Sequence, residues 1–562
     1  MATPRNQPPN DQSASGLRRA RLALAMLVLC GFVAAFADFR ELMPVRTGHW
    51  LASVQVVPAL LALAGGALVP GLILASLLLV TLAVGRVYCS VLCPLGILQD
   101  VAARLARWLR LRRKPLPFAR EHTLLRHLFV WSGVAAALVG WGAFALTLLD
   151  PYSHFGRGMS LLARPALTWL NNKLVWLGEA AGWGGLYRVD LPLPALGAVL
   201  FSAALLTLIL GMAALRGRLW CNTACPVGTV LGWVSRRAAF RLTIDKEACT
   251  RCAHCLRSCK AQCIDLRTSQ IDASRCVACY NCVSACDEHG IRHEFAWRRK
   301  AAAPAAEAVV ADPARRSLLR GSVKGLFLGT GLALAMDKAK AEDAATDASG
   351  QPVDYDELHK QKARREAGHG KGRRSAGVVP PGAKSVDHLL AHCTACQLCV
   401  SACPKHVLQP ALFEYGVKGF LKPRLDFDAS YCDFDCRACG EACPDGAIAL
   451  LPLEEKQVAQ IGIASFHEDR CIVKVNGKDC AACSEHCPTK AVETVPFGDN
   501  LRLPRVNDHL CIGCGACQFA CPVKPDKAIT VAGLHEHRRA RRPESRPAPP
   551  TPGATNGGDF PF

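Results

Sequence analysis

The stretch CTACQLCVSACP, residues 393–404, decides how the second half of this chain folds. Two-residue gaps separate its first three cysteines, and a fourth cysteine, followed by a proline, comes after three further residues. Three thiolates in such a loop can hold one face of a four-iron cluster, while the fourth cysteine reaches a second cluster. Zinc ribbons instead use separated Cys-x2-Cys pairs. The spacing therefore predicts [4Fe–4S] clusters.

Three more cysteine quartets follow, and the last repeats the spacing of the first. The second and third are variants whose first gap is three and eight residues long. We predict an α+β ferredoxin-like module over residues 386–534 that binds four [4Fe–4S] clusters. Adjacent quartets could exchange their fourth cysteines, or the first could pair with the last and the second with the third. The expected metal ligands are Cys393, Cys396, Cys399, Cys403, Cys432, Cys436, Cys439, Cys443, Cys471, Cys480, Cys483, Cys487, Cys511, Cys514, Cys517 and Cys521.

Residues 243–297 contain two further quartets, in which the fourth cysteine is not followed by proline. We predict a second α+β module with two [4Fe–4S] clusters, each closed by the fourth cysteine of the other quartet. Its expected metal ligands are Cys249, Cys252, Cys255, Cys259, Cys276, Cys279, Cys282 and Cys286. Cys263 and Cys30 lie outside every motif, and we expect both to be structural.

The first 242 residues predict an α-helical membrane domain. Hydrophobic residues make up 51% of the 562-residue chain and concentrate before residue 216. We predict a disordered cytoplasmic terminus over residues 1–21 and about four transmembrane helices within residues 22–242. The expected spans lie in residues 22–37, 47–85, 127–149 and 191–215. Prolines and glycines interrupt residues 47–85, so there we expect an interfacial or re-entrant piece before the span.

The net charge of +21 fits an anionic membrane surface better than nucleic acid. No helix-turn-helix, RNA-binding or zinc-finger pattern is present, so we expect no nucleic-acid partner. Residues 1–21, 102–126 and 216–241 carry 17 Lys and Arg, against six in residues 38–46 and 150–190. By the positive-inside rule, both ends of the four-helix domain and the two-cluster module face the cytoplasm of a bacterial inner membrane.

Each half of the membrane domain ends in the motif Cys-x3-Cys-Pro-x-Gly. A four-residue spacing puts both thiols of a pair on one face of a helix. Buried cysteines can pack simply as small apolar residues, but the repetition favours a redox or metal role. The candidate redox thiols are Cys89, Cys93, Cys221 and Cys225.

Residues 298–385 read as a linker that contains an export signal. Arg315 and Arg316 precede the twelve uncharged residues 325–336, so residues 314–336 resemble a twin-arginine signal or anchor. Small residues near position 335 could be cleaved, which would separate the two halves. The signal would carry the four-cluster module into the periplasm. Residues 535–562 are rich in Arg and Pro and are expected to form a disordered basic tail.

Together these motifs resemble two known protein families joined in one chain. Residues 18–297 resemble the NapH-type membrane iron–sulfur subunit, with its spans, paired Cys-x3-Cys-Pro motifs and two-cluster module. Residues 314–532 resemble the NapG/MauM-type periplasmic ferredoxin with four clusters. The resemblance implies a quinol dehydrogenase that passes electrons from the quinone pool to a periplasmic cytochrome or metalloenzyme, with a nitrate reductase-like system favoured.

The quinol site and the role of the paired thiols stay open at this stage. Polar residues in or beside apolar segments are candidates for binding quinone, here His49, Gln55 and His154. The cytoplasmic clusters could also receive electrons from a cytoplasmic donor. The alternative function is a maturation or regulatory factor for a periplasmic metalloenzyme, which would use the Cys-x3-Cys-Pro thiols in thiol–disulfide exchange.

Overall fold

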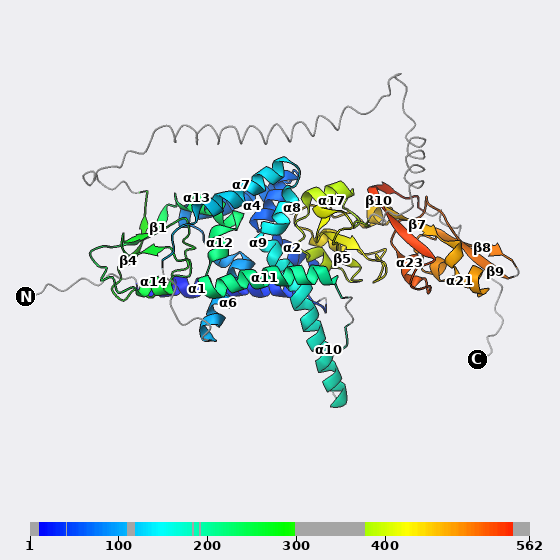
Figure 1. The fold of residues 1–562 in the computed structure, drawn as a ribbon, viewed down its shortest axis with the longest axis horizontal. Helices are drawn as coiled ribbons and strands as arrows, with labels where there is room; N and C mark the ends of the chain where they lie inside the picture. The colour runs from blue at the N-terminus through cyan, green and yellow to red at the C-terminus, as the bar shows by residue number, and fades with distance from the viewer. Residues whose placement is uncertain are drawn as a thin grey trace, which may run out of the picture.

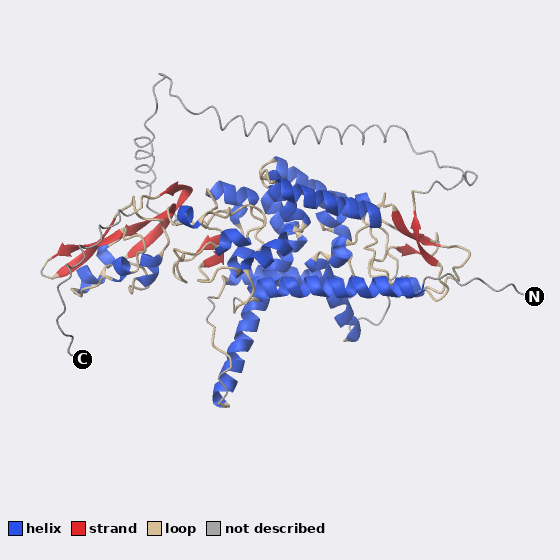
Figure 2. Ribbon diagram, turned by 180° about the vertical axis from the view of Figure 1, so that it is seen from behind, coloured by secondary structure: helices blue, strands red, loops and turns tan. Residues whose placement is uncertain are grey.

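The computed structural model describes residues 11–40, 42–109, 118–182, 185–189, 193–297, 377–498 and 500–542. An apolar helical unit lies in the middle, with one cysteine-rich module at each end (Figure 1). The described strands are confined to those two modules (Figure 2). The twin-arginine segment 314–336 lies outside the described residues.

The helical unit contains short as well as long helices, because glycines and prolines interrupt its apolar segments. Its elements are α1 (Asp11–Ala37), α2 (Val45–Ser53), α3 (Val56–Ala64), α4 (Leu68–Val84), α5 (Tyr88–Val91), α6 (Pro94–Trp108), α7 (Thr123–Leu138), α8 (Gly142–Leu149), α9 (Pro151–Gly158), the π-helix η1 (Met159–Ala163), α10 (Arg164–Ala180), α11 (Leu196–Arg216), α12 (Leu219–Thr223) and α13 (Pro226–Ser235).

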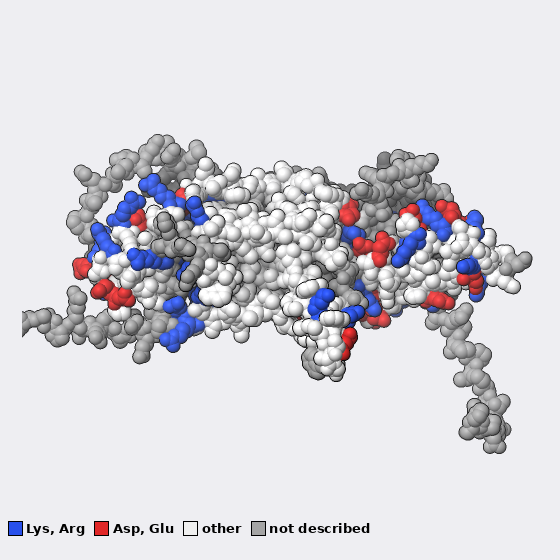
Figure 3. Space-filling view, turned by 60° about the horizontal axis from the view of Figure 1, so that its bottom comes forward, with Lys and Arg blue, Asp and Glu red and all other residues white. Residues whose placement is uncertain are grey.

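Two helices of the described part are long and apolar enough to cross a membrane. They are residues 16–37 of α1 and the whole of α11, and the pair α2 and α3, bent by 89°, would make a third if it counts as one span. The apolar helices α4 and α7 are shorter, with 17 and 16 residues. On the face drawn in Figure 3, uncharged residues cover most of the helical unit. Charged side chains gather over the modules at its ends and on the part of the middle region that protrudes at the bottom of the view.

The expected disordered N-terminus is wrong for residues 11–21, which form the first turns of α1. Tertiary contacts account for the longer helix. Arg21 is 7% exposed, its Nη1 lies 4.0 Å from Asp100 Oδ2, and the same nitrogen donates to the Ser90 carbonyl oxygen at 3.4 Å. A basic residue that looked like a membrane-flanking charge is therefore held inside the protein.

The N-terminal cysteine-rich module has the predicted α+β composition. Strand β1 (Phe240–Ile244) pairs antiparallel with β4 (Ile291–Phe295), and β2 (Ile264–Asp265) pairs with β3 (Gln270–Ile271). The short helix α14 (His254–Ser258) lies inside this pattern. Its small core consists largely of cysteines and isoleucines, including Cys255, Cys259, Cys282 and Ile291.

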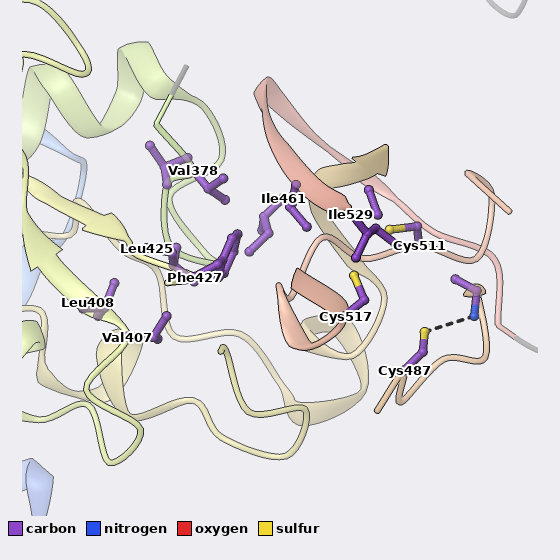
Figure 4. Close-up of a cluster of buried hydrophobic side chains, with 14 of the residues drawn as sticks. Val378, Val407, Leu408, Leu425, Phe427, Ile461, Cys487, Cys511, Cys517 and Ile529 are labelled. Atoms are coloured by element: carbon purple, nitrogen blue, oxygen red, sulfur yellow. Dashed lines mark hydrogen bonds between the residues drawn. The ribbon is translucent and has the colours of Figure 1, made fainter. Parts of the chain in front are cut away.

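The C-terminal module repeats short helices and two-stranded antiparallel sheets, in which β5 pairs with β6, β7 with β10 and β8 with β9. Ile461 of β7 and Ile529 of β10 belong to its core, and Ile529 lies beside Cys511 (Figure 4). The elements are α17 (Val386–His392), α18 (Leu398–Ser401), β5 (Leu408–Pro410), the 3-10 helix η2 (Val417–Gly419), β6 (Pro423–Leu425), α19 (Ala438–Ala442), α20 (Leu453–Lys456), β7 (Ala459–Phe466), the 3-10 helix η3 (Glu468–Arg470), α21 (Ile472–Asn476), α22 (Ala482–Glu485), β8 (Val492–Phe497), β9 (Leu501–Val506), α23 (Ala516–Ala520) and β10 (Ile529–Arg539).

Both expected boundaries of this module are wrong. It begins by residue 377, because Val379 is fully buried and Val378 forms a β-bridge with Leu425. Strand β10 also continues into the expected disordered tail, where Arg539 pairs with Ala459 of β7 after an irregularity that follows Gly533. Pairing with a neighbouring strand orders this basic segment, although its composition alone suggests a solvated tail.

Candidate iron–sulfur sites

The two quartets of the N-terminal module lie in the crossed arrangement that their spacing predicts. One cavity is lined by Cys249, Cys252, Cys255 and Cys286. A second cavity is lined by the first three cysteines of the other quartet, Cys276, Cys279 and Cys282, together with Cys259. Three neighbouring thiols and one distant thiol thus surround each cavity, which fits the ligand set of a [4Fe–4S] cluster.

Cys263 lines the second cavity as a fifth cysteine. Its sulfur lies 3.6 Å from the sulfur of Cys259. Either sulfur can donate the hydrogen bond between them, and both side chains are buried. Cys259 occupies the fourth position of the Cys-x2-Cys-x2-Cys-x3-Cys spacing, so it is the expected ligand of the two.

Adjacent quartets exchange their fourth cysteines in the C-terminal module, which decides between the two pairings that the sequence left open. Cys403 of the first quartet lines one cavity with the first three cysteines of the second. Cys443 of the second quartet interacts electrostatically with Cys396 and Cys399 of the first. Cys487 of the third quartet interacts in the same way with the cysteines of the fourth.

The order of these sites in space differs from their order in the chain. The backbone N–H of Cys432 donates to the carbonyl oxygen of Cys514 at 2.9 Å, so the second quartet contacts the fourth. The third quartet, which begins at Cys471 in front of α21, lies beyond the fourth near the far end of the module (Figure 1). Outward from the helical unit, the order is first, second, fourth and third.

The two Cys-x3-Cys-Pro motifs come together inside the helical unit. The four motif cysteines are each 3–5% exposed and interact electrostatically with one another: Cys89, Cys93, Cys221 and Cys225. All but Cys221 also belong to one core cluster. In both motifs the second cysteine is the N-cap of a helix whose first residue is the motif proline, a position at which proline needs no N–H partner.

The motif glycine has a steric reason in both repeats. A Cβ added at Gly96 would lie 2.5 Å from the carbonyl oxygen of Cys89. A Cβ added at Gly228 would collide with the carbonyl oxygen of Cys221 in the same way. Only glycine lets the helix that follows each motif approach the first cysteine of that motif so closely.

Two buried arginines that the sequence analysis missed link the repeats crosswise. Arg86 Nη2 donates to the carbonyl oxygen of Cys221 at 3.3 Å, and Arg218 Nη1 donates to that of Cys89. Each arginine follows a glycine and stands three residues before the first cysteine of its own motif. The longer repeat Gly-Arg-x2-Cys-x3-Cys-Pro-x-Gly was therefore readable in the sequence and would have found them.

Each of the three candidate quinone-binding residues contacts a different part of the protein. Gln55 is 1% exposed, and its Oε1 accepts a hydrogen bond from the Tyr88 hydroxyl at 2.7 Å. His154 is 3% exposed, and its ring packs edge-on against Trp220 with the centroids 5.6 Å apart. His49 faces the backbone of Cys443. These contacts give each residue a structural role, and quinone binding stays a prediction.

These features define an iron–sulfur protein in which an apolar helical unit joins two cluster-binding modules. Family models agree with that class. A "4Fe-4S binding domain" matches residues 66–115 and 198–244, two "4Fe-4S dicluster domain" models match residues 392–448 and 431–491, and a further "4Fe-4S binding domain" matches residues 504–525. Each segment of the first match contains one Cys-x3-Cys-Pro motif.

The chain belongs to the family of ferredoxin-type proteins that includes NapF. It is 31% identical to NapF of Escherichia coli K12 over 165 residues, which are 29% of this chain and 90% of NapF. It is 29% identical over 180 residues to the methylamine utilization ferredoxin-type protein MauN of Paracoccus denitrificans, which covers 31% of this chain and 48% of MauN. It is also 32% identical over 148 residues to MauM of Methylorubrum extorquens, covering 25% of this chain and 66% of MauM. No solved structure matches the chain.

Proposed function

We propose that the chain is a membrane-bound iron–sulfur protein of the quinol-dehydrogenase type, which passes electrons from the quinol pool to a periplasmic reductase or other redox partner. Its six quartets would hold six [4Fe–4S] clusters, which carry one electron at a time. The observation that carries the proposal is the position of the two cysteine-rich modules at opposite ends of one apolar helical unit.

Close packing between the helical unit and the C-terminal module supports a path for electrons into the four clusters of that module. Gly156 of α9 faces the carbonyl oxygen of Cys396 so closely that a Cβ would collide with it. Ser401 Oγ lies 3.0 Å from Ser160 Oγ. The short distance between Cys396 and the helical unit favours electron transfer at this junction, so the cluster of the first quartet would be the first to be reduced.

The cluster of the third quartet would be the last in the path. Residues 472–479 form the unusual eight-residue gap of that quartet and include α21, at the far end of the module (Figure 1). A periplasmic cytochrome or metalloenzyme would therefore dock at this end. The relatives named for methylamine utilization and for the Nap system support a redox partner of this class.

The topology also belongs to the proposal. Four spans, a cytoplasmic two-cluster module and a periplasmic four-cluster module in the bacterial inner membrane follow from the positive-inside charges and from the twin-arginine segment. A NapH-type subunit joined to a NapG/MauM-type ferredoxin would have this sidedness. Placement of the modules at opposite ends of α1 and α11 supports it.

Burial of the paired thiols weighs against the alternative function in maturation. Thiol–disulfide exchange with a partner protein needs an accessible thiolate. All four Cys-x3-Cys-Pro cysteines are at most 5% exposed. An exchange reaction with a partner protein would require the helical unit to open.

Quinol oxidation can be tested on the purified, oxidised full-length chain under anaerobic conditions. Menaquinol and ubiquinol are added separately, and the loss of cluster absorbance is followed over time. We expect rapid bleaching with one of the two quinols. Absence of bleaching, in a sample whose clusters are all reduced by dithionite, would rule out direct quinol oxidation.

A further inference from the structure

We propose that the four Cys-x3-Cys-Pro cysteines together bind one additional iron–sulfur cluster, held between the two repeats of the helical unit. The inference rests on the proposed electron-transfer function and adds a redox centre to its path. The two pairs come from segments separated by more than one hundred residues, yet all four thiols are buried near one another. Cys89, Cys93 and Cys225 belong to one core cluster, and the buried Cys221 interacts electrostatically with all three. Two cysteines from each repeat would supply the four ligands of such a cluster.

A buried positive charge beside these thiols calls for an anionic group. Arg86 is fully buried, and its Nη2 lies 3.8 Å from Cys89 Sγ. Its other hydrogen bonds go to Asn222 Oδ1 and to the carbonyl oxygens of Cys221 and Ser274. Within the described part of the chain no carboxylate lies at ion-pair distance from Arg86. An uncompensated buried charge is costly, and a cluster with four thiolate ligands would neutralise it.

Backbone donors are already directed at the second cysteine of each motif. The Gly228 N–H donates to Cys225 Sγ at 3.3 Å, and Gly96 takes the same position toward Cys93. Both cysteines cap the N-terminus of a helix, where free N–H groups can donate to a ligand sulfur. Thiolates are the form that binds iron.

Gln99 provides an independent sign of a missing acceptor. Its side chain is 1% exposed, and its Nε2 has no hydrogen-bond partner among the described residues. Its Oε1 accepts from the Cys221 thiol at 3.4 Å. Once Cys221 is a thiolate ligand, the amide can turn and donate Nε2–H to that sulfur. The donor that lacks a partner would then be satisfied.

A multi-iron cluster fits this donor set better than a single metal ion. Among the described residues, no group of three or more His, Cys, Asp or Glu side chains is arranged to hold one ion. The four cysteines of an iron–sulfur cluster are shared among two or four irons, so as a set they stand farther apart than the ligands of one zinc ion. Both motif segments, 66–115 and 198–244, also match the model described as a 4Fe-4S binding domain.

The site lies between the two cluster-binding modules. Cys279 of the N-terminal module packs in the same core as Cys89, and Arg86 bonds the Ser274 backbone of that module at 2.8 Å. On the other side, Trp220 precedes Cys221 and packs against His154 of α9. Helix α9 also places Tyr152 close to Cys396. The additional cluster would therefore connect the cluster at Cys279 with the cluster at Cys396.

Each step through this centre is a one-electron transfer. A reduced neighbouring cluster gives up one electron and is oxidised, while the central cluster gains that electron and is reduced. The central cluster then returns to its oxidised state as it reduces the cluster at Cys396. No covalent bond forms or breaks.

Iron counting tests the inference independently of quinol oxidation. The full-length chain is reconstituted anaerobically with iron and sulfide, and its iron content and Mössbauer spectrum are compared with those of a variant carrying Cys89→Ser, Cys93→Ser, Cys221→Ser and Cys225→Ser. We expect the variant to lose about two to four iron atoms per chain, with the other clusters retained. Cys30→Ser, at an exposed position of α1, is the matched control and should lose none. Equal iron content in the fourfold variant and the wild type would overturn the inference.

A second variant keeps all four thiols, in case the fourfold variant does not fold. Gln99→Leu removes the amide next to Cys221 and should leave the iron content unchanged. Loss of a hydrogen bond to a ligand sulfur should shift the reduction potential of one cluster. A redox titration monitored by electron paramagnetic resonance measures this potential. Potentials identical to those of the wild type for every cluster would contradict the inference.

Discussion

The glycine that ends each Cys-x3-Cys-Pro-x-Gly motif shows how a single residue positions the thiols. Gly96 and Gly228 allow helices α6 and α13 to pass directly beside the carbonyl oxygens of Cys89 and Cys221. Those oxygens also accept the crosswise hydrogen bonds from Arg218 and Arg86. The glycines and arginines therefore belong to one arrangement that holds the two repeats together.

Gly96→Ala and Gly228→Ala should each destabilise the protein. The new methyl group would overlap a backbone oxygen, and overpacking of this kind costs about 1–3 kcal/mol. Gly133→Ala in α7 is the matched control, because a Cβ there meets nothing within 4 Å. The apparent melting temperature in detergent should fall for the first two variants and stay level or rise for the control. Equal melting temperatures in all three would contradict the steric explanation.

Asp100 is one of the residues that link the helical unit to the N-terminal module. Its carboxylate bonds Arg218 Nη2 at 2.7 Å and also binds Lys260. Asp100→Asn should leave these cations without a partner, and breaking a buried pair in this way costs about 3–5 kcal/mol. Glu468→Gln removes an exposed ion pair with Lys474 and should cost at most about 1 kcal/mol. Thermal unfolding of both variants should show a larger loss of stability for Asp100→Asn than for Glu468→Gln.

At the scale of elements, α9 and α18 form the junction between the helical unit and the four-cluster module. A side chain at Gly156 would collide with the Cys396 backbone and lie 2.9 Å from ring atoms of Phe36. The position is therefore closed to any larger residue.

Gly156→Leu should separate the four-cluster module from the helical unit. We expect slower quinol-driven reduction of the clusters at an unchanged iron content, while dithionite should still reduce every cluster. Gly211→Ala in α11, where a Cβ meets nothing within 4 Å, is the control. Reduction of the Gly156 variant at the wild-type rate would mean that electrons do not enter the module through this contact.

The cysteine spacings predicted the cluster-binding modules and the crossed quartets, because short loops with fixed gaps encode their own geometry. Contacts between segments far apart in the sequence could not be predicted from these spacings. The helical residues before Leu22 depend on Arg21 meeting Asp100, and the end of β10 depends on pairing with Ala459. The choice between the two pairings of quartets, and the contact of Cys432 with Cys514, likewise depend on how distant loops pack.

At the scale of the whole molecule, three buried regions lie in sequence from one end to the other. The N-terminal module contacts the core around Cys89, and that core continues through α9 to Cys396. Exposed apolar side chains such as Leu72, Leu128 and Leu200 surround the middle region.

The most direct test follows quinol-driven reduction of individual clusters in the full-length chain and in a variant carrying Cys393→Ser and Cys396→Ser. Electron paramagnetic resonance after rapid freezing distinguishes the clusters, and dithionite defines full reduction. We predict that quinol reduces the C-terminal clusters of the wild type. The variant lacks the first cluster of that module, so its remaining C-terminal clusters should stay oxidised with quinol. Dithionite should still reduce them. Reduction of those clusters by quinol at the wild-type rate in the variant would contradict an electron path through the Cys396 junction.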